Sequence, residues 1–423
     1  MNALEFVQGM IRREWPVRLL APVIGRYNPF LPEFRLDPYA SYRRLRETAP
    51  VYKSPALRTV ILSRFADVVP ILQDARFGVD RRQAKMAQRL GMFESMRPDF
   101  RDAITTSLLM IDPPDHTRLR RLVSKAFTPR VIERLRARTE ELVATLLDDM
   151  ARRPDPDLIR DLADPLPLLI IGELLGVPVE DRARLKSWSN DAVGILDPLQ
   201  AEGGIAGIVR AFDELRTYLH DVFADRRAHP REDLVSNLVA VEEQGDVLSE
   251  VELDSLCLLL LVAGNETTTN LIGNGVLALL NHPAERRRLQ DDPSLAKSAI
   301  EEMLRYDSPI QATDRVVLEP LELHGRRLAK GDVVGLLLGA ANRDPARFAD
   351  PDRLDVGRED NAHLAFGHGV HFCLGAQLAR LEGQIAITRL LERFPDLDGE
   401  RAPKTWKRSL VLRGLTSLRL RLG

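Results

Sequence analysis

The pattern of apolar and polar positions predicts a mainly helical protein with short strands near both ends. The pattern is mostly helical from about residue 64 to about residue 310, and helical character returns from 374 to about 393. Alternating apolar residues predict strands at 51–52, 59–63, 316–323, 333–338 and within 410–420. Helices and strands in separate runs indicate a helix-rich α+β fold with small sheets, rather than an alternating parallel sheet.

The longest predicted helix extends from Ser249 to Asn281. Ser249 and Glu252 have the spacing of a capping box, and His282-Pro283 ends the apolar pattern. At 1.5 Å per residue this helix is roughly 50 Å long, which is enough to cross a domain of this size. Because its middle is strongly apolar, we expect it to pass through the core.

Composition and charge narrow the class of protein. The 423 residues are 44% hydrophobic with a formal net charge of -2, which excludes disorder and argues against a nucleic-acid binder. We find no repeat and no linker, so we expect one domain over 1–423. No apolar run approaches the ~20 residues of a membrane span, and residues 1–15 lack the pattern of a secretory signal. Two cysteines cannot form a disulfide framework, and we expect a cytoplasmic monomer.

The most informative segment is residues 366–375, which read FGHGVHFCLG. Gly367 and Gly369 permit a tight turn, and Cys373 lies where the next helix begins. The positive end of a helix dipole favours a thiolate, so this arrangement suits a soft axial ligand to iron. Cys257, by contrast, lies within the apolar helix and is expected to be a small buried hydrophobe.

This segment resembles the haem-binding loop of the cytochrome P450 family, F-G-x-G-x-H-x-C-x-G, at every fixed position. The resemblance implies the family's triangular, mostly helical fold, with haem b between the helix 249–281 and the loop 366–375. It also implies that Cys373 is the thiolate ligand of the haem iron. By the same resemblance, His371 binds a haem propionate and Phe366 packs near the thiolate.

A second motif, AGNETT at residues 263–268, lies inside the long helix. Ala263, Gly264 and Thr267 share one helix face, where small side chains leave room for a flat cofactor. The segment resembles the family's oxygen-binding motif, A-G-x-[DE]-T-[TS]. The resemblance implies that Glu266 and Thr267 deliver protons to dioxygen, the co-substrate.

Four basic side chains are expected to hold the haem carboxylates. His116 and Arg120 are four residues apart after a helix start marked by prolines, so both project from one face. The family has this H-x-x-x-R at the same place, and Arg315 matches its other propionate-binding arginine. Together with His371, these residues would bind both carboxylates.

Glu302 and Arg305 form an i,i+3 pair of the kind that is usually a weak surface bridge. The sequence around them resembles the family segment in which this pair is buried, and the resemblance makes Arg353 its third partner. We therefore interpret these three residues as structural rather than catalytic.

By family position, the distal substrate pocket is lined by Leu258, Val262, Ile310, Gln311 and Ala312. These residues are largely apolar, so the resemblance implies a monooxygenase that hydroxylates or epoxidises a hydrophobic molecule of the fatty acid, terpenoid, steroid or polyketide class. The segment 79–103 would be a variable lid, with adaptable apolar side chains at Met86, Met92, Phe93 and Met96.

Electrons from NAD(P)H would arrive through a ferredoxin and its reductase, because the chain has no flavin or iron–sulfur signature. Arg118, Arg121, Lys125 and Arg130 either form a docking patch for an acidic ferredoxin or are ordinary solvated charges. The sequence also leaves open a peroxide-driven peroxygenase, a haem-thiolate isomerase, a non-catalytic haem-binding homologue and a scaffold without a cofactor. The intact Glu266-Thr267 pair favours the monooxygenase.

Overall fold

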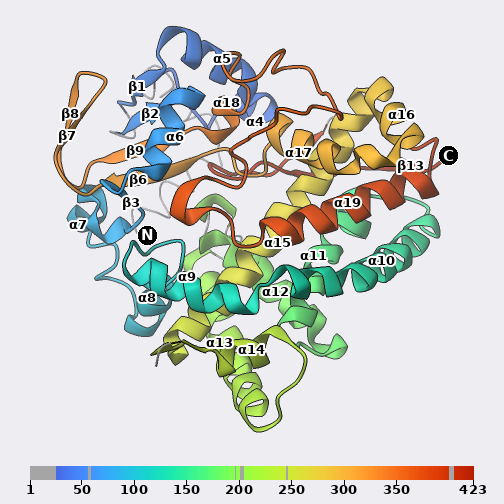
Figure 1. Ribbon diagram of the computed structural model, residues 1–423, viewed down its shortest axis with the longest axis horizontal. Coiled ribbons are helices and arrows are strands. Elements are labelled where there is room, and N and C mark those ends of the chain that lie inside the picture. Colours follow the sequence, from blue (N-terminus) through green and yellow to red (C-terminus); the bar gives the residue numbers. More distant parts are fainter. Residues whose placement is uncertain (1–24, 56–58, 196, 201–203, 244–245, 400–403) are drawn as a thin grey trace.

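The computed structural model describes residues 25–55, 59–195, 197–200, 204–243, 246–399 and 404–423. In Figure 1 a sheet with short helices lies at the upper left, and long helices make up the rest of the molecule, with α15 among them. The first 15 residues, in which we expect no secretory signal, lie outside the described residues. One domain over 1–423 likewise stays a prediction.

The helices cover most of the described chain. They are α4 (Pro32–Leu36), α5 (Pro38–Thr48), α6 (Phe65–Gln73), α7 (Lys85–Arg89), α8 (Pro98–Thr105), α9 (Asp115–Ala126), α10 (Pro129–Ala151), α11 (Pro165–Leu174), α12 (Arg182–Ala192), α13 (Gly204–Ala228), α14 (Leu234–Ala240), α15 (Glu250–Asn281), α16 (Pro283–Asp291), α17 (Ala296–Tyr306), α18 (Leu338–Ala341) and α19 (Ala376–Arg393). The strands are β1 (Val51–Lys53), β2 (Val60–Leu62), β3 (Phe77–Gly78), β4 (Glu242–Glu243), β5 (Asp246–Val247), β6 (Thr313–Val317), β7 (Leu321–Leu323), β8 (Arg326–Leu328), β9 (Val333–Leu336), β10 (Asp398–Gly399), β11 (Thr405–Trp406), β12 (Leu415–Ser417) and β13 (Leu420–Arg421). The mainly helical fold with small sheets is confirmed.

Strands from distant parts of the chain share the largest sheet. Its order is β1-β2-β9-β6-β3, with β2 parallel to β9 and the other neighbours antiparallel. The strands predicted at 51–52 and 59–63 are confirmed as β1 and β2, which pair with each other and join the later strands in one sheet. The predicted strand 316–323 is divided, because β6 ends at Val317 and Pro320, which has no N–H to donate, precedes β7.

Helix α15 is the central element of the helical region. The predicted capping box is present, with the Ser249 hydroxyl accepting from the Glu252 amide and the Glu252 carboxylate accepting from the Ser249 amide. Among the described residues, α15 is the one helix long and apolar enough to cross a membrane, but 67% of its apolar window is buried inside the protein. It packs against α11, α17 and α19 and is therefore a core helix.

Candidate functional site

The loop before α19 holds Cys373 in a defined position. Gly367 and Gly369 have φ angles of 71° and 73°, the left-handed region that favours glycine. A Cβ at Gly369 would lie 2.5 Å from the Leu72 carbonyl oxygen, so the loop packs closely against the end of α6. The Cys373 amide donates to the Phe366 carbonyl at 2.9 Å and closes the turn. These contacts confirm the glycine-dependent turn that the sequence predicts.

A cavity of about 320 Å³ lies between this loop and α15. It brings together the residues predicted to bind the cofactor and Thr267, which was predicted to be catalytic. The cofactor-binding set is His116, Arg120, Ala263, Gly264, Arg315, Phe366, His371 and Cys373. A Cβ at Gly264 would lie 2.7 Å from Ile171 Cδ1, so this glycine also permits the close approach of α11. The cavity therefore joins one cysteine to small residues of α15 and to a group of basic side chains.

The basic group consists of His116 and Arg120 on α9, Arg315 on β6 and His371 beside Cys373. The imidazole rings of His116 and His371 are 4.2 Å apart between centroids. Burial, followed by the positive charges of His116 and Arg315, lowers the pKa of His371 to about 3. Burial also lowers the pKa values of His116, Arg120 and Arg315.

This basic group fits an anionic ligand. His116 Nε2 is buried and has no hydrogen-bond partner. The nearby carboxylate of Asp112 is engaged by the amides of Val79 and Asp80, at 2.8 and 3.3 Å. Two buried guanidinium groups beside two imidazoles, one of which has a ring nitrogen without a partner, are a site for carboxylates from outside the chain. The residues present therefore fit haem, whose two propionates would meet the basic group while its iron meets Cys373.

The surroundings of the Cys373 thiol act on its pKa in opposite directions. Burial raises its pKa, whereas the Gly375 amide and the guanidinium groups of Arg120 and Arg380 lower it. The net direction is upward, so the helix start alone does not produce the thiolate that the sequence predicts, because loss of solvent outweighs it. A soft cation bound to the sulfur would supply the missing positive charge.

Arg380 packs against the predicted Phe366 next to the cysteine, and sequence reasoning missed this arginine. The Arg380 guanidinium lies 4.5 Å from the centroid of the Phe366 ring. Arg380 also donates to both carboxylate oxygens of Glu301, at 2.6 and 2.8 Å, and His363 Nε2 lies 3.1 Å from the same carboxylate. Burial raises the pKa of Glu301, but Arg380 and His363 outweigh it and hold the pKa at about 2.

The two members of the acid–threonine pair have different surroundings. Thr267 lines the cavity, and its hydroxyl donates to the Ala263 carbonyl at 2.7 Å. Glu266 is absent from the cavity lining, and its carboxylate accepts from Lys407 Nζ at 2.8 and 2.9 Å and from Asn270 Nδ2 at 3.3 Å. The partner Lys407 lies 141 residues away and carries no local sequence signal.

Glu382 on α19 is a further cavity residue that sequence reasoning missed. It is 2% exposed, and its Oε2 has no hydrogen-bond partner. Burial raises its pKa to about 8, so the carboxyl is mostly protonated at neutral pH. The available signal was an acid among the buried residues Leu378, Leu381 and Ile385 of α19.

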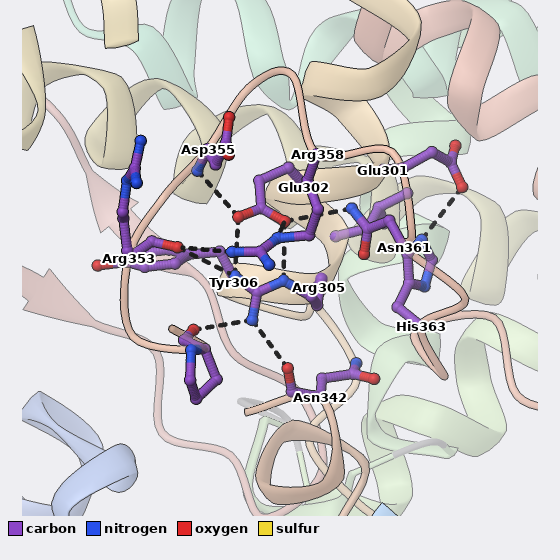
Figure 2. A network of polar contacts seen from close by, with 12 residues as sticks. Glu301, Glu302, Arg305, Tyr306, Asn342, Arg353, Asp355, Arg358, Asn361 and His363 are labelled. Atoms are coloured by element: carbon purple, nitrogen blue, oxygen red, sulfur yellow. Dashed lines mark hydrogen bonds and ion pairs between the residues drawn. The ribbon is translucent and has the colours of Figure 1, made fainter. Parts of the chain in front are cut away.

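The predicted structural pair is confirmed as fully buried. Glu302 and Arg305 are joined by two hydrogen bonds of 2.7 and 2.8 Å, and both side chains are 0% exposed (Figure 2). The third side chain is Arg358, whose Nε donates to Glu302 at 3.0 Å. The prediction of Arg353 is corrected: its carbonyl accepts from Arg305 at 3.2 Å, and its side chain is exposed. The loop after Arg353 turns back and brings Arg358 to the carboxylate.

A larger cavity of about 530 Å³ shares Val79, Leu109, Leu259, Ile310, Thr313 and Arg315 with the first one. Four of the predicted substrate-pocket residues line it: Leu258, Val262, Ile310 and Ala312. Gln311 does not, because its amide nitrogen donates to the Ser308 carbonyl at 2.8 Å and to the Tyr39 hydroxyl at 3.2 Å.

The predicted lid contributes to this cavity through unexpected residues. Val79, Arg81 and Ala103 line it, whereas Met86, Met92, Phe93 and Met96 do not. Met86 and Met92 are exposed on the surface, and Phe93 packs in a small cluster with Val316.

The predicted docking patch is partly occupied by internal ion pairs. Arg118 pairs with Glu252 on α15 and with Asp246, the latter at 3.4 Å. Its charge is therefore compensated within the chain. The side chain of Arg130 lies outside the described residues.

Comparisons with known proteins agree with this geometry. The family described as Cytochrome P450 matches residues 206–414. The chain is 40% identical to the polyketide biosynthesis cytochrome P450 PksS of Bacillus subtilis (strain 168) over 406 residues, covering 94% of this chain and 98% of that protein. It is 45% identical to cytochrome P450 107B1 of Saccharopolyspora erythraea over 402 residues, covering 92% and 96%. The solved structure of PksS superposes with a TM-score of 0.86 at 39% identity, covering 94% of this chain and all (100%) of that one.

Proposed function

This chain belongs to the cytochrome P450 family of haem-dependent monooxygenases, and we propose that it hydroxylates or epoxidises a large hydrophobic molecule with dioxygen as co-substrate. The observation that carries the proposal is the cavity in which Cys373 meets four basic side chains. One of them, His116, has a buried nitrogen without a partner. Few ligands other than haem would satisfy a soft sulfur donor and this basic group together.

The proposed cofactor is haem b, with Cys373 as the iron ligand. His116, Arg120, Arg315 and His371 would hold its two carboxylates, and Ala263 and Gly264 leave space above it. Haem, when bound, supplies the reductive activation of dioxygen and the transfer of one oxygen atom. The protein excludes water and positions the substrate through the apolar walls of both cavities.

We assign proton handling to Thr267 and Glu266. Thr267 lines the cavity one helical turn after Ala263 and Gly264. Glu266 is one residue away but is held by Lys407, so its carboxylate must leave or share that ion pair to exchange a proton with Thr267. Lys407 is thus part of the proposed proton path.

A polyketide or another large apolar molecule is the substrate class that the larger cavity supports. Its volume of about 530 Å³ suits a ligand of drug size or larger, and the relative PksS is named for polyketide biosynthesis. Electrons would come from NAD(P)H through a ferredoxin and its reductase in the bacterial cytoplasm.

The decisive test is the absorbance difference spectrum of the dithionite-reduced protein with and without carbon monoxide. We expect a strongly red-shifted Soret band that Cys373→Ala abolishes. The matched control is Cys257→Ala, because Cys257 is fully buried outside the cavity lining and should leave the band intact. A band at the position of histidine-ligated haem, or protein that retains no haem after reconstitution, would refute the proposal.

A further inference from the structure

The guanidinium of Arg380 is held in a fixed place beside the cysteine loop. Its Nε and Nη2 donate to the two carboxylate oxygens of Glu301 on α17, at 2.6 and 2.8 Å. Its central carbon lies 4.5 Å from the centroid of the Phe366 ring, at the start of the loop that carries Cys373. A two-pronged ion pair and a cation–π contact together fix the position of this charge, although the side chain is 21% exposed.

His363 fixes the other member of the ion pair. Its Nδ1 accepts from the Ala365 amide at 3.1 Å, so Nε2 carries the ring proton and donates it to Glu301 at 3.1 Å (Figure 2). The His363 side chain is 3% exposed, and its ring lies 5.9 Å from the Phe366 ring between centroids. The Glu301 carboxylate is therefore anchored from two sides, and both charges of the pair have defined positions.

The positive member of this pair acts on the sulfur. The Cys373 amide donates to the Phe366 carbonyl, and the charge of Arg380 lowers the pKa of the Cys373 thiol. Arg120 has the same influence, but it lines the cavity and is assigned to a haem carboxylate, which would compensate its charge. Arg380 does not line the cavity, so its charge persists when the cofactor is bound.

We propose that Arg380 is a positioning residue that keeps a positive charge beside Phe366 and thereby raises the reduction potential of haem iron ligated by Cys373. Reduction adds one electron and hence one negative charge to the site, and a nearby cation stabilises that charge. Glu301 opposes the effect, because its carboxylate compensates part of the Arg380 charge. Groups behind a metal ligand tune the metal in this way. The inference rests on the proposed function, since it requires haem at Cys373.

The test is the midpoint reduction potential of the purified, haem-loaded protein, measured by spectroelectrochemical titration. Arg380→Gln should lower the potential and Glu301→Gln should raise it. We expect each to change the reduction equilibrium about threefold to tenfold, where tenfold corresponds to about 59 mV for one electron. Arg380→Lys keeps the charge and should stay near the wild-type potential. Both glutamine variants break the same ion pair, so a purely structural role predicts shifts in one direction.

The matched controls are Arg389→Gln and Glu392→Gln. These two residues form an ion pair on the same helix, both side chains are 50% exposed, and Arg389 lies about 14 Å along the axis from Arg380. Both controls should keep the wild-type potential.

The inference is overturned if Arg380→Gln and Glu301→Gln shift the potential in the same direction or not at all, or if Arg380→Lys lowers it as much as Arg380→Gln. Should Arg380→Gln retain no haem, the direction of the Glu301→Gln shift decides. The carbon monoxide spectrum is recorded on the same preparations. A wild type without the red-shifted band refutes the proposed haem function, whereas unshifted potentials with the band present refute only the role of Arg380.

Discussion

The ion-pair network around Glu302 and the wall of the larger cavity differ in how their buried polar groups are paired. In that network, the fully buried carboxylate of Glu302 accepts from Arg305, Arg358, Asn361 and the Asp355 amide (Figure 2). In the wall of the larger cavity, Ser255 has no partner and its helical neighbours are apolar. The polar groups of the ion-pair network are thus paired within the chain, whereas the Ser255 hydroxyl is buried without a partner.

The largest effect is expected from breaking the buried ion pair of Glu302 and Arg305. Glu302→Gln leaves the Arg305 guanidinium buried without a carboxylate, which should lower the free energy of unfolding by about 3–5 kcal/mol. The measurement is urea unfolding followed by circular dichroism. The control is Glu133→Gln, which breaks an i,i+3 pair with Arg136 that is exposed to solvent. That variant should unfold at the wild-type midpoint. Equal losses of unfolding free energy in the two variants would show that burial does not distinguish the two ion pairs.

An effect of about 3 kcal/mol between pH 4.5 and pH 7 is expected from Glu382, whose buried carboxyl lies on the cavity side of α19. Its pKa is about 8 in the folded protein against an ordinary value of 4.5, so the folded state binds the additional proton between these values. The stability of the wild type should therefore fall as the pH rises from about 4.5 to about 8 and then level off. Glu382→Gln removes this ionisation and should therefore flatten the dependence of stability on pH.

The check is the unfolding midpoint of wild type and Glu382→Gln at a series of pH values. Glu392→Gln on the same helix is the control, because its side chain is 50% exposed and bonded to Arg389. This control should keep the wild-type slope. A Glu382→Gln protein with the same slope as the wild type would show that another group causes the pH dependence.

The smallest change in stability is expected from replacing two buried serines, Ser308 and Ser255. The Ser308 hydroxyl donates to the Leu304 carbonyl at 2.7 Å and accepts from Asn342 Nδ2 at 2.8 Å, so Ser308→Ala leaves a buried amide unpaired. We expect a loss of about 1–3 kcal/mol. Ser255→Ala breaks no internal bond and should leave the thermal unfolding midpoint unchanged. If calorimetric unfolding shows that both variants lose the same stability, the Ser255 hydroxyl bonds within the chain. The contrast between the Glu302 network and the cavity wall then fails.

Local sequence was sufficient for the elements whose cause is local. The Ser249 capping box, the glycine turn before Cys373 and the i,i+4 pair of His116 and Arg120 each depend on residues within ten positions, and the structure contains all three. The helix 249–281 was predicted for the same reason, because its apolar pattern and its two boundaries are contiguous.

Hydrogen-bond and ion-pair partners that lie far apart in the chain could not be predicted from local sequence. Arg353 and Arg358 are chemically equivalent candidates for Glu302, and only the path of the loop decides between them. The pairing of Glu266 with Lys407 depends on where the C-terminal segment passes α15. Gln311 turns to Tyr39, 272 residues away, rather than into the cavity that its neighbours line.

The sequence by itself therefore determined the mainly helical fold, the cysteine loop and the set of residue types at the site, since backbone turns, helix starts and helix faces follow from neighbouring residues. Only the tertiary structure decided which charges compensate one another, which acid stays protonated and which buried hydroxyl lacks a partner. Burial and distance set these properties, and both depend on the packing of segments that lie far apart along the chain.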